Sequence, residues 1–223
     1  MRLRVLVAVV TAAALLSAAC GLYDDHPYAL PTATTQASVN LLQNAGFEDT
    51  GVWTPSDPGA FSISEQAHAG LESGELRGTK KGVAASQPVA DATTIPEFVS
   101  GYYRLNGWKP PAGADAEVGL RVTVRAGGAD FILHFSFGGL QATPAGTPGN
   151  ERYVFLSRGA PATGAWTYFG YAVAAAFKDQ FGLADTGIEG IAVGIELRGE
   201  GTQAWFDDVY AGTQARNPNR PAR

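Results

Sequence analysis

Apolar and polar residues alternate with a period of two along most of the chain, as they do in β-strands that bury one face. Glycine, proline, asparagine or aspartate separate most of these runs, and only residues 174–181 have helical character. Residues 125–130 include Gly127 and Gly128, which supply the positive φ angles of a tight hairpin turn. Many short strands with almost no helix predict an all-β domain, either a β-sandwich or a jelly roll. The predicted strands are residues 60–65, 74–78, 82–89, 98–106, 117–125, 130–137, 152–156, 166–173, 190–198 and 203–210.

The two ends of this predicted domain carry acids that a buried strand does not usually contain. Asp207 and Asp208 interrupt the aromatic and β-branched run 204–210, and Glu48 follows an apolar residue at the end of residues 40–48. We predict that these first and last strands lie side by side and that their carboxylates share a hard cation. Calcium takes carboxylate and carbonyl oxygens, so it is the expected ion, in a structural role.

The candidate calcium ligands are Gly46, Glu48 and one of Asp207 and Asp208, with further carbonyl groups from residues 67–71. The sequence does not choose between the two aspartates. The alternative is that these acids cap backbone amides at a strand end and hold no ion.

Four segments of the chain follow one another in the order found in a known family. Residues 40–48 resemble the opening motif Asn-Leu-x-x-Asn-x-Gly-Phe-Glu of the CenC-like carbohydrate-binding modules of families 4, 9 and 22. Residues 67–76, 166–169 and 206–209 are similar to the turn and strand, the late strand and the closing Asp-Asp-Val motif of that family. The resemblance covers about residues 39–212. It implies a galactose-binding-like jelly-roll β-sandwich of two antiparallel sheets that binds glycan without catalysis.

Strand alternation also predicts a binding face. If residues 98–108, 117–125, 130–137 and 190–198 share a sheet, the side chains opposite their apolar positions form its open face. Aromatic rings cover the apolar face of a pyranose, and arginine and carboxylate groups bond its hydroxyls, so this set suits a sugar. The alternative is a solvated face stabilised by Arg–Glu cross-strand pairs. The predicted ligand-binding residues are Tyr102, Arg104, Trp108, Arg121, His134 and Glu196.

The N-terminus has the pattern of a secretory signal. Arg2 and Arg4 precede an apolar run and small residues, and the run is shorter than the ~20 residues that span a bilayer. Cys20 is the only cysteine, and its position after Leu-Ser-Ala-Ala resembles the bacterial lipobox. This resemblance implies that Cys20 carries acyl chains such as palmitate and anchors the protein outside the bacterial cell membrane, at the cell surface or in the periplasm. The alternative is ordinary secretion with a free N-terminal cysteine.

The predicted organisation is therefore a signal peptide at residues 1–19, a tether at 20–38, one jelly-roll domain at 39–212 and a disordered tail at 213–223. The net charge of −5 becomes more negative when Arg2 and Arg4 are removed, which argues against a nucleic-acid partner. The three histidines lie apart, and neither a Gly-x-Ser-x-Gly nor a His-Glu-x-x-His motif is present, so we predict no enzyme.

Two functions from different classes follow from this organisation. The first is a lipoprotein whose jelly roll binds a polysaccharide or other glycan. The second is a structural lipoprotein subunit that contacts a membrane-associated protein complex through the same fold. An apolar, arginine-poor open face would favour the protein partner.

Overall fold

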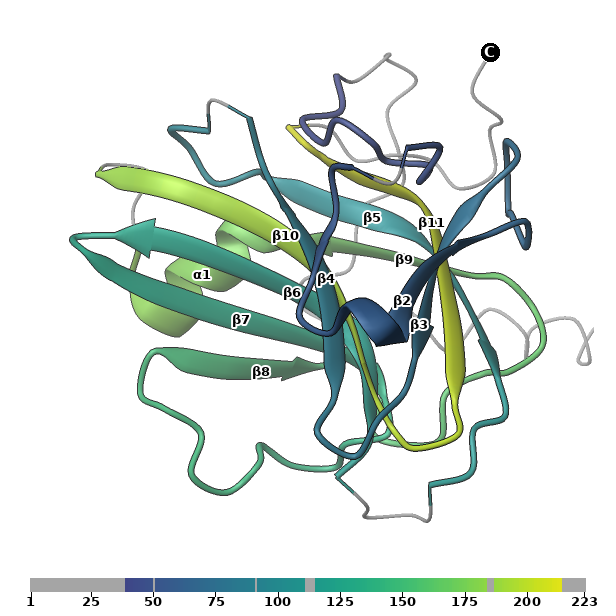
Figure 1. Ribbon diagram of the computed structural model, residues 1–223. Helices are drawn as coiled ribbons and strands as arrows, with labels where there is room; N and C mark the ends of the chain where they lie inside the picture. The colour runs from purple at the N-terminus through teal and green to yellow at the C-terminus, as the bar shows by residue number, and fades with distance from the viewer. Residues whose placement is uncertain (1–38, 50, 91, 111–114, 184–186, 214–223) are drawn as a thin grey trace, which may run out of the picture.

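Two β-sheets face each other in the computed structural model, which describes residues 39–49, 51–90, 92–110, 115–183 and 187–213 (Figure 1). One sheet has the order β1-β4-β10-β6-β7-β8, with β1 (Thr54–Pro55), β4 (Val83–Pro88), β10 (Ile188–Arg198), β6 (Glu117–Ala126), β7 (Ala129–Gly138) and β8 (Glu151–Phe155). The other has the order β2-β3-β11-β5-β9, with β2 (Phe61–Ser64), β3 (Ser73–Arg77), β11 (Gln203–Gly212), β5 (Phe98–Asn106) and β9 (Thr167–Ala172). The short helices η1 (Pro58–Ala60) and α1 (Val173–Phe181) complete the described elements. The predicted all-β jelly-roll sandwich is confirmed.

The ten strands predicted from alternating runs all form, with bounds that match those runs or differ from them by one or two residues. The hairpin between β6 and β7 turns at Gly127 and Gly128, whose φ angles of 59° and 75° are unfavourable for other residues. β1 was not predicted, because two residues are too few to show a period of two.

One strand pair departs from the expected antiparallel arrangement. β8 runs parallel to β7, with Ile132 opposite Glu151 and Ser136 opposite Phe155. The reason is the connection between them: residues 139–150 return along the sheet before β8 begins, so both strands start from the same end.

The core consists of the apolar positions that alternate along the strands and face the space between the sheets. The apolar positions of β6 are fully buried, namely Val118, Leu120, Val122 and Val124. The same holds in β10 for Val193, Ile195 and Leu197. Full burial of such a side chain stabilises the fold by about 1.5–3 kcal/mol. Alternation therefore identifies the core-facing positions of β6 and β10 correctly.

Alternation does not identify the sheet to which a strand belongs, and here the prediction was wrong. β5 pairs with β11 and β9 in the five-stranded sheet and is not a neighbour of β6, β7 or β10. The period of two distinguishes inside from outside for any strand of a sandwich, but it carries no information about the pairing partner.

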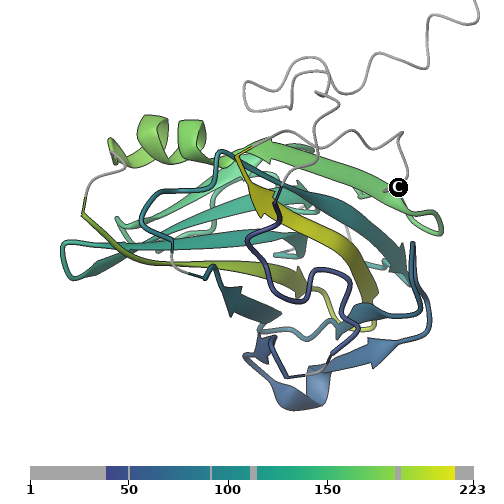
Figure 2. The same cartoon turned by 90° about the horizontal axis from the view of Figure 1, so that it is seen from above.

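The first and last segments of the domain lie side by side, as predicted (Figure 2). The Leu41 amide donates to the Ala211 carbonyl at 2.9 Å, and the Val209 amide donates to the Ala45 carbonyl at 3.0 Å. The Asn40 side chain also bonds the backbone of β11 at two points. Residues 39–49 do not form a regular strand, however, so the prediction of a first strand there was wrong.

Helix α1 follows β9 directly and lies at one end of the sandwich (Figures 1 and 2). It buries Val173, Ala176 and Phe177, and it ends at Gly182, whose left-handed conformation lets its amide donate to the Lys178 carbonyl. Among the described residues, no helix has the length and apolar character needed to cross a membrane.

Candidate functional site

The open face of the six-stranded sheet contains a hollow of about 260 Å³. Strands β10, β6, β7 and β8 form most of its lining, and the start of β4 forms one edge. The outward positions of these strands alternate with the buried apolar positions, so their polar side chains gather on this face. The polar residues that line the hollow are Ser56, Lys81, Glu117, Arg121, His134, Glu151, Tyr153, Glu196 and Arg198.

Strand register brings the central side chains together from segments that are far apart in the sequence. Arg121 lies opposite His134 on one side and Gly194 on the other, and His134 lies opposite Tyr153 of β8. Since directly paired residues point to the same side of a sheet, these side chains share one face.

Gly119 of β6 leaves space in the middle of this face because it has no side chain. Gly119 of β6 lies between Glu196 of β10 and Ser136 of β7. A Cβ atom at Gly119 would lie 2.7 Å from the Phe135 carbonyl oxygen and 3.4 Å from Glu196 Oε1. The absence of a side chain at this position therefore leaves room for the Glu196 carboxylate and for whatever enters the hollow.

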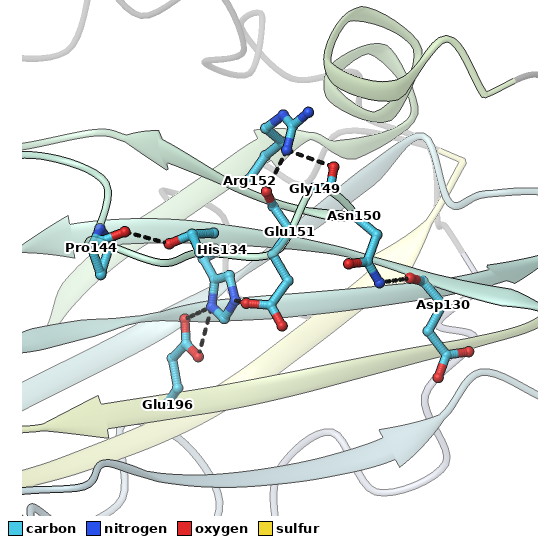
Figure 3. Close-up of polar contacts among 9 residues, drawn as sticks. Asp130, His134, Pro144, Gly149, Asn150, Glu151, Arg152 and Glu196 are labelled. Carbon is cyan, nitrogen blue, oxygen red and sulfur yellow. Dashed lines mark hydrogen bonds and ion pairs between the residues drawn. The ribbon is translucent and has the colours of Figure 1, made fainter.

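A buried histidine connects two carboxylates in the hollow (Figure 3). His134 Nδ1 lies 2.9 Å and 3.0 Å from the two oxygens of Glu196, and Nε2 lies 3.8 Å from Glu151 Oε2. The His134 ring also stacks on Tyr153, with 4.3 Å between ring centres and 7° between planes. Because a carboxylate only accepts hydrogen bonds, Nδ1 carries the proton in this pair.

The charges around Glu196 keep it ionised. Burial would raise its pKa, but the charge and hydrogen bond of His134, together with Arg121 and Arg198, hold the pKa below its usual value. Glu196 therefore presents a carboxylate inside a partly enclosed face.

Glu117, in contrast to Glu196, has a raised pKa and keeps its proton. It is only 3% exposed, and burial, reinforced by repulsion from Glu196, raises its pKa to about 9. Burial also raises the pKa of Tyr153. At neutral pH both groups are protonated, so each offers an O–H donor beside the Glu196 carboxylate.

Three polar groups that line the hollow have no hydrogen-bond partner among the described residues. Two of them are buried atoms, Oε1 of Glu117 and Nε2 of His134, and the third is the half-buried side chain of Arg121. Buried polar groups in native proteins are nearly always bonded to protein or water, so an unbonded set that faces one hollow indicates a place for an outside partner.

The structure brings together half of the residues predicted to bind a ligand. Arg121, His134 and Glu196 all line the hollow. Tyr102 and Arg104 lie instead on the five-stranded sheet, because β5 belongs to that sheet. The prediction of one shared face was therefore wrong.

Trp108 also lies away from the hollow. It follows the end of β5, and its ring is half-buried against the core near Gly139, where an added Cβ would come within 2.8 Å of it. Its role at this position is packing.

Sequence reasoning missed Glu117, Glu151 and Tyr153 as site residues. Glu117 shares the outward alternation of Arg121, and Glu151 and Tyr153 occupy alternate positions of β8, so a period-two signal was present. That signal did not show that β8 pairs with β7 and places Tyr153 against His134.

The acidic cluster predicted to bind calcium lies around the Asp207–Asp208 bulge of β11. Asp207 is fully buried and accepts hydrogen bonds from the amides of His68, Ala69 and Asp208 at 2.7–3.0 Å. Burial, reinforced by repulsion from Asp208, raises the pKa of Asp207 to about 6, although the three amide hydrogen bonds lower it. The pairing of β11 with β5 shifts at this point, and Asp208, with φ of 51°, turns to bring its carboxylate 2.9 Å from His68 Nδ1.

Glu48 approaches the same region from the first segment. Its Oε1 accepts from the Leu71 amide at 3.0 Å. A Cβ built on Gly46 would lie 3.8 Å from both Glu48 Oε1 and Asp207 Oδ1, so both carboxylates lie on the side of Gly46 where a side chain would point. Ligand atoms of His68, Asp207 and Asp208 also lie within 4.8 Å of one another.

No protein-family model and no curated protein matches the sequence. Among solved structures, the chain is similar to the CBM22-1 xylan-binding domain of Paenibacillus barcinonensis Xyn10C, at 16% identity over 82% of this chain and 100% of that one, with a TM-score of 0.47. It is similar to the family 11 carbohydrate-binding module of the cellulosomal cellulase Lic26A-Cel5E of Clostridium thermocellum, at 10% identity over 83% and 100% of the two chains, with a TM-score of 0.47. It is also similar to TmCBM61 in complex with β-1,4-galactotriose, at 17% identity over 79% and 99%, with a TM-score of 0.44. These three structural neighbours are carbohydrate-binding modules.

Proposed function

We propose that this protein is a non-catalytic glycan-binding protein and that the hollow on the six-stranded sheet binds the glycan. The observation that carries the proposal is that the buried, unbonded atoms Glu117 Oε1 and His134 Nε2 line one hollow together with the Arg121 side chain. A ligand rich in hydroxyl groups satisfies such a set, because each hydroxyl both donates and accepts.

The chemistry of each group fits this role. The Arg121 guanidinium has N–H donors for neighbouring hydroxyls, the neutral Glu117 and Tyr153 contribute O–H donors, and the Glu196 carboxylate accepts. Tyr153, stacked on His134, gives the wall an aromatic surface against which a pyranose C–H face packs.

The same arrangement argues against glycosidase chemistry. Glu196 has both oxygens bonded to His134 Nδ1, so it is held as part of a fixed ion pair and not presented as a free nucleophile or base. The hollow is also polar and is lined by Lys81, Glu117, Glu151 and Glu196, which are residue types depleted from the cores of protein interfaces, and this disfavours the alternative of an apolar contact with a protein complex.

The direct test is native electrophoresis through gels that contain soluble polysaccharide. The panel is xylan, β-1,4-galactan, mixed-linkage β-glucan and xyloglucan, and a gel without polysaccharide gives the reference mobility. We expect one or more of the four to retard the protein. Unchanged mobility in all four gels, together with no signal on a broad glycan array, would reject glycan binding.

We also propose a structural calcium beside Gly46, held by Glu48 and Asp207. A carboxylate has about four lone-pair positions, and three backbone amides occupy three of those of Asp207. The fourth is on Oδ1, which lies, like Glu48 Oε1, 3.8 Å from a Cβ built on Gly46, and carboxylate oxygens are ligands that calcium takes. Asp208 faces His68 and is the weaker candidate of the two aspartates.

Removal of calcium should lower the melting temperature, and its return should restore it. Calcium at about 100 times its dissociation constant adds about 2.7 kcal/mol to the free energy of unfolding. Differential scanning fluorimetry in EDTA and across a calcium titration measures the effect, with Glu48→Gln as the variant that should lose it. A melting curve that does not respond to either treatment would leave Glu48 and Asp207 as caps of backbone amides only.

The anchor predicted at Cys20 lies outside the described residues, and we propose it from the sequence motif alone. Two acyl chains provide a stable membrane anchor. In a bacterial host, we expect the protein to sediment with the membrane fraction and Cys20→Ala to block processing or release it. A mature N-terminal peptide without acyl groups by mass spectrometry would disprove lipidation.

A further inference from the structure

The outer face of the five-stranded sheet contains a second hollow, of about 360 Å³, on the side of the sandwich opposite the first. Arg104 and Asn106 of β5, and Gln203 and Trp205 of β11, face outward between buried core residues of the same strands. Gln66, from the connection between β2 and β3, closes one side.

Hydrogen bonds fix the walls of this hollow. Arg104 donates to Gln66 Oε1 at 3.1 Å and lies over the Trp205 ring, 5.9 Å from its centre. The Trp205 indole donates to Ser64 Oγ at 3.1 Å, and Gln203 Nε2 donates to a Glu75 carboxylate oxygen at 3.1 Å. These contacts hold the side chains in place before any ligand arrives, which lowers the entropy cost of binding.

Some polar groups in this hollow are left without a partner. Arg104 Nε is buried and unbonded within the described part of the chain, and the exposed Asn106 side chain has no hydrogen-bond or ion-pair partner there. Beside the hollow, half-buried aromatic rings extend along the same sheet face. Tyr102 packs edge-on against Tyr168 at 5.5 Å, next to Trp166.

We propose that this face is a second saccharide-binding site and that one domain holds two polysaccharide chains, one on each sheet. The identification of the ligand as a saccharide rests on the proposed function. Side-chain amides and an arginine that is already bonded by Gln66 suit the hydroxyl groups of a neutral sugar. The half-buried Trp166 and Tyr168 rings suit its C–H face, since the Tyr102 ring is stacked on His68 and the Trp205 ring is buried under Arg104. The outer faces of the two sheets point in opposite directions, so the two sites engage different chains and cross-link them.

Four proteins test the proposal on the same polysaccharide panel: the wild type, Arg121→Ala, the double variant Gln66→Ala/Asn106→Ala, and the triple variant. Gln66 and Asn106 are exposed, so their replacement should leave the fold intact, and Gln180→Ala on the exposed side of α1 is the matched control. We expect each site variant to retain reduced retardation, with an apparent dissociation constant about tenfold or more weaker, because loss of one of two sites removes avidity. We expect the triple variant to show none.

Turbidity measures the cross-linking of polysaccharide chains, which would not depend on Gln66 and Asn106 if these residues had only a structural role. The wild type should cross-link the polysaccharide into a scattering network, and either site variant should fail to do so. Complete loss of retardation in Arg121→Ala, or a Gln66→Ala/Asn106→Ala variant that behaves as the wild type, would overturn the second site. If Arg121→Ala is normal and the double variant loses all binding, the glycan binds at the second hollow alone, and both the first hollow and the two-chain arrangement are rejected. If nothing in the panel retards the wild type, both are rejected.

Discussion

Arg121→Ala should weaken glycan binding by roughly 10- to 150-fold. Hydrogen bonds to a charged group are worth about 1.5–3 kcal/mol, and this range converts to that factor in the dissociation constant. Arg121 lies at the centre of the six-stranded face and, within the residues that the structure describes, has no hydrogen-bond or ion-pair partner. Its replacement therefore removes ligand contacts without breaking a hydrogen bond or ion pair within the protein, while it also removes one of the charges that hold the pKa of Glu196 low. Isothermal titration with the oligosaccharide unit of the polysaccharide that retards the wild type gives the dissociation constant of this hollow when Arg121→Ala is compared with its parent in the Gln66→Ala/Asn106→Ala background, where the second hollow does not contribute.

Arg125→Ala is the matched control for this measurement. Arg125 faces the same side of β6, four residues further on, but it is exposed at the hairpin and pairs with Glu189 at 3.4 Å. Exposed pairs of this kind contribute about 0–1 kcal/mol, so the variant should fold and bind as the wild type does. Equal affinities for the Arg121→Ala, Arg125→Ala and wild-type proteins would show that the hollow is not where the sugar binds.

The sequence was sufficient to predict the strands because alternation responds to burial, which is local to each strand. The same signal correctly placed Arg121, His134 and Glu196 on an outward face of their strands. It could not separate them from Tyr102 and Arg104, since a sandwich has two outward faces and both alternate with the same core.

The remaining site residues depend on pairing between distant segments. Tyr153 contacts His134 only because the connection 139–150 returns the chain and makes β8 parallel to β7. In the sequence, Glu117 looks like any acid at the start of a strand. Only the folded structure shows that its side chain is buried, with 3% exposed. Neither its protonation nor its unbonded oxygen can be read from its neighbours in the sequence, because both arise from the environment that the folded sheet creates.

The burial of Glu117 makes the stability of the protein fall as the pH rises, and Glu117→Gln should remove most of this dependence. The folded-state pKa of about 9 lies above the ordinary value of 4.5, so between these values the folded protein keeps a proton that the unfolded chain has lost. Within this window each pH unit lowers the free energy of unfolding by about 1.4 kcal/mol. A glutamine side chain at this position has the shape of the neutral acid and titrates in neither state.

Urea unfolding at pH 6.5, 7.5 and 8.5 isolates this contribution. Asp207, whose pKa is raised to about 6, changes stability in the same direction but mostly below this range. The lowered pKa of Glu196 gives stability that is lost only under acid conditions, as the pH falls through its folded-state value. We expect the wild type to lose stability across the three pH values and Glu117→Gln to be more stable than the wild type at pH 8.5. Glu65→Gln, at an exposed position between β2 and β3, should follow the wild-type profile. Parallel profiles for the wild type and Glu117→Gln would mean that Glu117 is ionised in the folded protein and that it does not act as an O–H donor in the hollow.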